Sequence, residues 1–191
     1  MSLQTSRNSE FRNSNASLRP RVPVSPGGRT TNNEPYYIVN SANFPELYNV
    51  FQEMGGEALG YQLAIVGGGN NNAAPYYNRR IIGIGLELLN NAGGLADIRV
   101  LMAHEIHHVQ QRERNGGRDF PNDPVQRRYR ESEADLAAAC EAGSVDPVID
   151  MLRRLNVGRS EDPNYPSLDN RIAILQRNRR DPCRAVREGI Q

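Results

Sequence analysis

The amino-acid sequence predicts an α+β fold in which strands come first and helices dominate the second half of the chain. Short apolar runs bounded by Gly or polar residues occur at 36–40, 61–66 and 79–84, a pattern typical of strands. From residue 95 onward, apolar residues instead recur at intervals of three and four, which indicates helices. Because the two patterns occupy separate parts of the chain, we expect a small mixed sheet followed by a mostly helical half.

Helical spacing also identifies one segment among the predicted strands, residues 44–54, with Pro45 near its start. A short helix is expected at 86–89. The longest helix begins near Leu95 and carries one apolar stripe for about five turns. That stripe consists of Leu95, Ile98, Met102, Ile106 and Val109. Further helices are predicted at 125–142, 147–156, 167–178 and 182–189, and a loop rich in Gly and Asn is predicted at 67–75.

Composition separates the N-terminal segment from the rest of the chain. Apolar residues make up 38% of the sequence, and the shortage is concentrated in residues 1–34, which are rich in Ser, Asn, Arg, Pro and Gly. Such a segment buries too little to offset the entropy of ordering it, so we expect residues 1–34 to be disordered. Residues 35–191 are expected to form a single domain, which is what a chain of this length accommodates.

Charge and hydropathy exclude several kinds of partner. The formal net charge is +1 and the arginines are scattered, so we expect no nucleic-acid partner. No segment approaches the ~20 apolar residues that span a bilayer, and we expect no membrane insertion. The N-terminus lacks the apolar core of a signal peptide. A soluble protein is expected, either cytoplasmic or exported, and its oligomeric state is left open.

All 23 basic residues are Arg, and the chain contains no Lys. Codon bias explains this poorly, because the chain also has 20 Asn, whose codons are AT-rich like those of Lys. Lys is the target of ubiquitination and acetylation. A chain without Lys therefore suits an exported effector that works in a foreign eukaryotic cytosol. This hypothesis fails if Lys-rich relatives persist equally long in host cytosol.

The two cysteines, Cys140 and Cys183, are far apart and lack the paired spacing of a metal knuckle. We expect them to be free buried thiols. The alternative is a disulfide, which would join two predicted helices and indicate an oxidising compartment.

The central motif lies in the long predicted helix, where His104-Glu105-Ile106-His107-His108 forms an H-E-x-x-H sequence. Residues four apart lie one above the other on a helix, so His104 and His108 can bind the same metal ion. Glu105 is placed to reach a water molecule at that ion without binding the metal. This arrangement favours metal-assisted hydrolysis, with one Zn²⁺ as the cofactor and Glu105 as the general base.

A catalytic zinc site takes three protein ligands, and the chain has no histidine outside this motif. The third ligand is therefore expected to be a carboxylate from the segment Glu131-Ser132-Glu133-Ala134-Asp135. We assign Glu131 to the metal, with Glu133 as the alternative. Asp135 lies four residues after Glu131 and is assigned to hold a ligating imidazole by its other nitrogen. The competing interpretation is an exposed acidic helix start.

These two segments together resemble the M48 (Ste24/HtpX-type) family of gluzincin zinc metallopeptidases, whose signature is H-E-x-x-H followed by E-x-x-A-D. The resemblance extends over about residues 60–175. It includes 78–89 (NRRIIGIGLELL), which is similar to the strand and short helix before the zinc helix, and Tyr165-Pro166-Ser167 through Arg171-Ile172, which is similar to a His-Pro and Arg-Ile segment. The membrane helices of many members are absent, so the chain resembles a soluble, minimal form.

The resemblance implies a zincin-like fold with the sheet packed on the active-site helix, and it supports Glu131 as ligand and Asp135 as support for a histidine. It also implies that residues 79–84 form an edge strand along which an extended peptide lies. The substrate-binding residues would then be Arg79, Arg80, Ile81, Ile82, Gly83 and Ile84.

Two residues depart from the family pattern. His107 stands where a small residue is usual, and Tyr165 replaces the His before Pro. The donor to the tetrahedral oxyanion is therefore expected to be Tyr165 or Arg171, with structural packing as the alternative role for both.

The sequence as a whole predicts a zinc-dependent endopeptidase acting on a protein or peptide substrate. The first alternative is a non-catalytic binding or adaptor module stabilised by a metal. The second is a zinc hydrolase of a non-peptide amide, which would share every site residue.

Overall fold

The computed structural model describes residues 10–121, 123–155 and 165–188. Contacts within the chain group into two compact units, Met1–Met102 and Ala103–Gln191. The division falls within α3 (Leu95–Arg114), the longest described helix.

Unit 1 is built on a mixed sheet of five described strands in the order β1-β2-β3-β5-β4. The strands β3 and β5 are parallel, and every other neighbouring pair is antiparallel. The bounds are β1 (Gly28–Arg29), β2 (Pro35–Ile38), β3 (Gln62–Val66), β4 (Ala73–Tyr76) and β5 (Ile81–Gly85).

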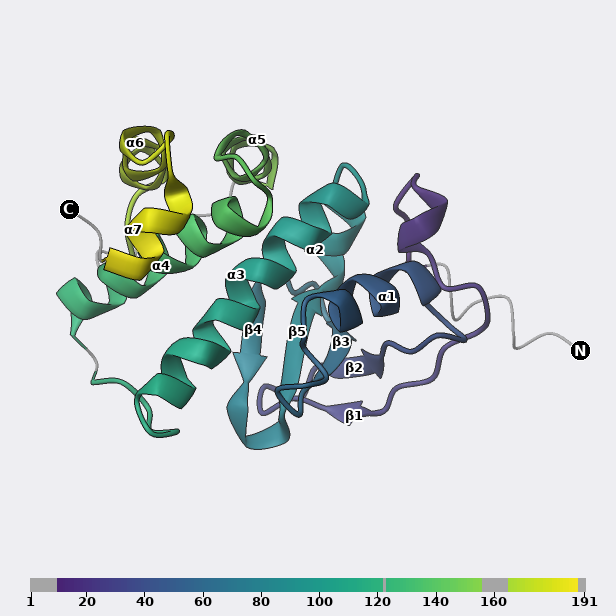
Figure 1. Cartoon of the computed structure of the whole chain (residues 1–191). Coiled ribbons are helices and arrows are strands. Elements are labelled where there is room, and N and C mark those ends of the chain that lie inside the picture. Colours follow the sequence, from purple (N-terminus) through teal and green to yellow (C-terminus); the bar gives the residue numbers. More distant parts are fainter. Residues whose placement is uncertain (1–9, 122, 156–164, 189–191) are drawn as a thin grey trace, which may run out of the picture. The chain divides into compact units, whose positions relative to one another are not determined.

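Two helices of unit 1 accompany this sheet, α1 (Pro45–Glu53) and α2 (Leu86–Asn91), and α2 contacts both β3 and β5 (Figure 1). Apolar side chains of the central strands and the helices are fully buried, as expected where both faces of a strand are covered. Those that are less than 2% exposed include Leu47, Phe51, Leu63, Ile65, Ile82, Ile84, Leu88 and Leu89. Short 3₁₀ turns lie at Ala16–Leu18 and Tyr77–Arg79.

The segment before β1 contributes buried side chains to unit 1, whereas its composition predicts disorder. Phe11, Leu18 and Val24 are each less than 5% exposed. The buried side chain of Asn13 donates hydrogen bonds to carbonyl oxygens at the end of α2, with distances of 2.6 Å to Leu89, 3.2 Å to Asn90 and 2.8 Å to Ala92. The carbonyls at the end of a helix lack the full set of backbone partners, and here, among the described residues, only that of Leu89 also accepts from a backbone N–H, that of Ala92 at 3.4 Å. Residues 1–9 lie outside the described residues.

Unit 2 consists of the second part of α3 and four further described helices. Among them, α4 contacts each of α5, α6 and α7, and Figure 1 shows these helices gathered around it. Asp123 caps α4 and Ser167 caps α6, each through its side-chain oxygen. The bounds are α4 (Pro124–Glu141), α5 (Asp146–Leu155), α6 (Leu168–Arg177) and α7 (Pro182–Glu188).

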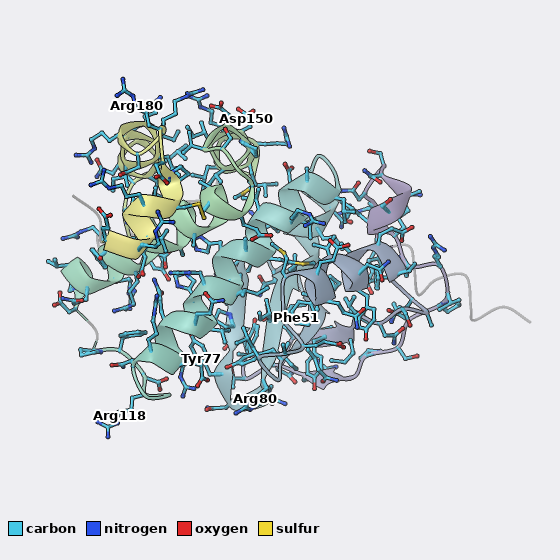
Figure 2. The ribbon with its side chains drawn as sticks, in the orientation of Figure 1. Phe51, Tyr77, Arg80, Arg118, Asp150 and Arg180 are labelled. Carbon is cyan, nitrogen blue, oxygen red and sulfur yellow. A yellow bond between two sulfur atoms is a disulfide. The ribbon has the colours of Figure 1, made fainter. Side chains whose placement is uncertain are left out.

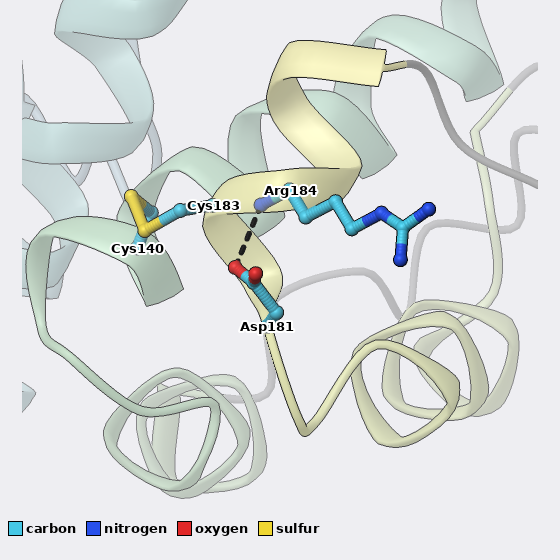
Figure 3. Close-up of a disulfide and its surroundings, with 4 residues drawn as sticks. All are labelled: Cys140, Asp181, Cys183 and Arg184. Atoms are coloured by element: carbon cyan, nitrogen blue, oxygen red, sulfur yellow. Dashed lines mark hydrogen bonds between the residues drawn. A yellow bond between two sulfur atoms is a disulfide. The ribbon is translucent and has the colours of Figure 1, made fainter.

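A disulfide between Cys140 and Cys183 joins the end of α4 to α7 (Figure 3). The expectation of two free thiols is therefore wrong. The two helices pack together with these Cα atoms 4.7 Å apart, a proximity that a sequence separation of 43 does not reveal. A cross-link over this separation stabilises a fold by roughly 3–4 kcal/mol through the entropy of the unfolded chain.

The α+β class with a mixed sheet is confirmed, whereas the zincin-like packing stays a prediction. Helix and strand ends lie within two residues of the expected ones, and the expected ends at 156 and 189 lie outside the described residues. No helix of the described residues combines the length and the apolar character needed to cross a membrane.

The strand β1 was not predicted, and the strand assignments were wrong in two further places. The predicted loop at 67–75 contains the start of β4, whose Asn- and Gly-rich surroundings hide the strand. The strand predicted at 79–84 is β5, and it is not an edge strand, because it pairs with β3 on one side and β4 on the other. Arg79 and Arg80 precede it and are exposed, and Figure 2 shows Arg80 near Tyr77 at this turn.

We predict that Asn13→Ala lowers the free energy of unfolding by about 1–3 kcal/mol, because buried carbonyls at the end of α2 lose their donor. Urea denaturation of the full chain measures this change. The control is Asn71→Ala at an exposed position. Equal stability of the two variants would show that the N-terminal segment does not hold α2.

Candidate metal centre

Three side chains of unit 2 converge on one point. His104 and His108 lie one turn apart on α3, and their Nε2 atoms are 3.0 Å apart. Glu131, in the second turn of α4, places Oε2 3.4 Å from Nε2 of His104 and Oε1 3.5 Å from Nε2 of His108. One ligand atom from each residue lies within 4.8 Å of the others, so the three residues could hold a metal ion.

The separations in this cluster are of the size found around a bound metal ion. A tetrahedral ion bound at about 2.0–2.1 Å holds its ligand atoms about 3.3–3.4 Å apart. The two Nε2 atoms are 3.0 Å apart, and a different oxygen of Glu131 faces each of them, at 3.4 and 3.5 Å. The open side of a three-ligand site would remain for water or substrate.

The other nitrogen of each imidazole has an oxygen neighbour. Nδ1 of His104 lies 3.0 Å from Oδ1 of Asp135, close enough for an ion pair although not aligned as a hydrogen bond. Nδ1 of His108 lies 2.8 Å from Oε1 of Gln111.

With a proton on each Nδ1, both Nε2 atoms and the Glu131 carboxylate are acceptors that face one another. Only a proton or a metal cation between them relieves that repulsion.

The pKa values of the metal-free residues reflect the same crowding of acceptors. Burial lowers the pKa of His104, but the carboxylates of Asp135 and Glu131 outweigh it and raise this pKa to about 10. The pKa of His108 is also raised, because the Glu131 carboxylate outweighs the effect of burial. Burial raises the pKa of Glu131, but the two histidines hold it well below its usual range. The site therefore stabilises positive charge between its ligands.

Asp135 is itself held by Arg171 of α6. The guanidinium donates from Nε to Oδ2 at 2.7 Å and from Nη2 to Oδ1 at 2.5 Å, a bidentate pair. Asp135 is 1% exposed and Arg171 is 4% exposed. Burial alone would raise the pKa of Asp135, but Arg171 and His104 keep it lowered. The carboxylate beside His104 is thus ionised and fixed in place.

Glu105 follows His104 on α3 and is buried. Burial raises its pKa, and the nearby His104 and His108 offset part of that effect. A buried carboxylate with a raised pKa next to paired histidines is a suitable proton acceptor and donor for hydrolysis.

Glu133, the alternative ligand, lies away from the two metal-facing imidazole atoms. Its carboxylate accepts hydrogen bonds from Gln111 at 2.8 Å and Arg114 at 2.9 Å, and lies 3.3 Å from Nε2 of His107. Burial raises the pKa of Glu133, but His107, Gln111 and Arg114 lower it to about 2. Of the two acidic candidates, the structure brings Glu131 to the histidine pair.

Sequence reasoning assigned no role to Gln111, and it did not predict that His107, Arg114 and Glu133 form a cluster. The available signals were spacings: Gln111 lies one turn after His108, and Arg114 lies two turns after His107. Neither spacing indicates a function without knowledge of which residues of α4 lie opposite.

The remaining predicted site residues are placed as follows. Tyr165 is 39% exposed, and its ring lies 5.2 Å from the guanidinium carbon of Arg127. Residues 81–84 are buried in unit 1. Their role in substrate binding stays a prediction.

No family model, curated protein or solved structure matches the chain.

We predict that Arg171→Met lowers the free energy of unfolding by about 3–5 kcal/mol, because it leaves the buried Asp135 carboxylate without its partner. Chemical denaturation measures the loss. Adding Asp135→Asn should recover part of it, since no unpaired charge remains. The exposed Arg177→Met is the control. A loss from Arg171→Met no greater than that of the control would contradict this account of the pair.

We predict that Glu131→Ala weakens zinc binding by more than about 100-fold, whereas Glu133→Ala, which changes only an outer partner, weakens it by about 10-fold. Competition with a chromogenic chelator measures both affinities. Loss of zinc from the Glu133 variant alone would reverse the assignment of the third ligand.

Proposed function

We propose that the chain is a zinc-dependent endopeptidase with one Zn²⁺ held by His104, His108 and Glu131. The observation that carries the proposal is the convergence of these three acceptors beside the buried Glu105. Two imidazole nitrogens and one carboxylate are a typical donor set for catalytic zinc. The two cysteines bind each other and so offer no competing thiolate pair.

The chain's own residues then have distinct tasks. A bound zinc ion supplies an electrophile that lowers the pKa of a water molecule toward ~7 and polarises the scissile carbonyl. Glu105 accepts the proton of the attacking water and delivers it to the leaving amine. Asp135, held by Arg171, keeps the imidazole of His104 in the orientation that turns Nε2 toward the ligand cluster.

The bidentate contact of Arg171 with Asp135 supports a positioning role for Arg171 rather than donation to the substrate. Tyr165 is then the better candidate for the oxyanion donor, because its ring is partly exposed and a hydroxyl can supply the hydrogen bond.

The choice of a peptide as substrate rests on the resemblance to M48-type gluzincins. A metal-stabilised binding module would retain the same three ligands without turnover. A zinc hydrolase of a non-peptide amide would retain Glu105 as well. Cleavage of a peptide library by the wild-type chain separates these functions.

The disulfide supports a location in an oxidising compartment or outside the cell, where such bonds persist. It fits export better than residence in the cytoplasm. Alkylation of free thiols in protein taken from its native source tests this: labelling of both cysteines would contradict export.

We predict that Glu105→Gln lowers peptide cleavage by about 10²–10⁴-fold while zinc remains at one ion per chain, because the amide cannot accept the proton. A quenched fluorescent peptide library and metal analysis measure the two quantities. Glu113→Gln, an exposed change on the same helix, is the control and should leave both unchanged.

Full cleavage by the Glu105 variant would show that the mechanism is wrong. Zinc binding by a wild type that cleaves no peptide would favour a binding module or an amidase.

A further inference from the structure

Gln111 lies between the two helices that carry the candidate ligands, α3 and α4. Its side chain is 4% exposed and lies one turn after His108 on α3. Oε1 is 2.8 Å from Nδ1 of His108, while Nε2 donates to the backbone oxygen of Arg130 at 3.0 Å and to Oε2 of Glu133 at 2.8 Å. All the polar atoms of one buried amide are thus engaged.

The contacts of Nε2 fix which way the amide points. A carbonyl and a carboxylate are both acceptors, so only the NH₂ group can face Arg130 and Glu133. The opposite orientation would set the amide oxygen against two acceptors. The amide oxygen therefore faces His108, and it can accept a hydrogen bond only from a protonated Nδ1. In the neutral imidazole, the lone pair is then on Nε2, which faces His104 and Glu131.

The same amide also reaches α4 next to the third ligand. Arg130, whose backbone oxygen accepts from Gln111, directly precedes Glu131. A single side chain on α3 therefore joins the imidazole of one ligand to the backbone beside another.

Glu133 keeps the amide in place. Its Oε2 accepts from Gln111, while its Oε1 accepts from Arg114 at 2.9 Å and lies 3.3 Å from Nε2 of His107. The carboxylate is thus held from α3 at two further points, and it cannot turn away from Gln111 without losing them.

We propose that Gln111, held by Glu133, is a positioning residue that fixes the ring orientation of His108 and couples it to Glu131. This inference rests on the proposed metal site. It assigns Gln111 as the hydrogen-bond partner of His108, the second histidine of that site. Like Asp135 beside His104, Gln111 places an oxygen next to Nδ1 of its histidine, but this oxygen belongs to a neutral amide and lies within hydrogen-bond distance.

Zinc affinity provides the first test. Gln111→Leu removes both the acceptor for His108 and the donor to Arg130, and it should weaken zinc binding about 10–100-fold, as loss of an outer partner does. Gln110→Leu is the matched control, since Gln110 is the adjacent, exposed residue of the same type. Chelator competition on the full chain measures both, with a thermal melt to show that each variant is folded.

The second test reads the ring of His108 directly. The chain has only three histidines, so ¹⁵N-histidine labelling gives three imidazoles to follow in the zinc-loaded protein. Wild type should show His108 bound through Nε2 with the proton on Nδ1. Gln111→Glu should retain that signal, because a carboxylate still accepts from Nδ1.

A third variant exchanges the pair, Gln111→Glu with Glu133→Gln. Its zinc affinity should return toward that of wild type, because the amide at position 133 again donates to the carboxylate at position 111.

The outcomes separate this inference from the proposed function. If wild type binds no zinc, the proposed function fails, and the inference fails with it. If wild type binds zinc but Gln111→Leu binds it equally well, the inference alone is wrong. If the leucine variant does not fold, the wild-type spectrum decides: a His108 bound through Nδ1 overturns the inference.

Discussion

Two imidazole Nε2 atoms and one carboxylate meet in unit 2, and with a proton on each Nδ1 all three are acceptors that face one another. The Nε2 atoms of His104 and His108 and the carboxylate of Glu131 lie 3.0–3.5 Å apart. Facing acceptors repel one another unless a proton or a metal cation lies between them. The raised pKa of both histidines and the lowered pKa of the carboxylate express this in the metal-free protein. A metal cation satisfies all three at once.

Most of what orients this cluster comes from α4 and the elements attached to it. One face of α4 supplies Glu131 and Asp135, and its last turn carries Cys140. Asp135 is paired with Arg171 of α6, and Cys140 is bonded to α7. The disulfide and the buried ion pair therefore restrain the helix that carries the third ligand. Preorganisation of this kind is what a metal site of defined geometry requires.

The sequence predicted those features that depend on spacing along one helix. His104 and His108 meet because residues four apart share a face, and Asp135 follows Glu131 by the same rule. Features that depend on which helices lie together were not predictable: the Cys140–Cys183 bond and the bridge from Gln111 to α4. The sequence also did not reveal the bidentate contact of Arg171 with Asp135, so Arg171 was predicted as a candidate oxyanion donor. The strand at 73–76 was missed because the Gly and Asn residues before it indicated a loop. This strand pairs with β5, which is therefore an interior strand.

X-ray absorption at the zinc edge of the zinc-loaded full chain tests the metal centre most directly. The account predicts four-coordinate zinc with two imidazole nitrogens and oxygen ligands at about 2.0–2.1 Å, and no sulfur. Sulfur scattering at about 2.3 Å, or a single imidazole, would contradict the assignment of His104, His108 and Glu131 as the ligands.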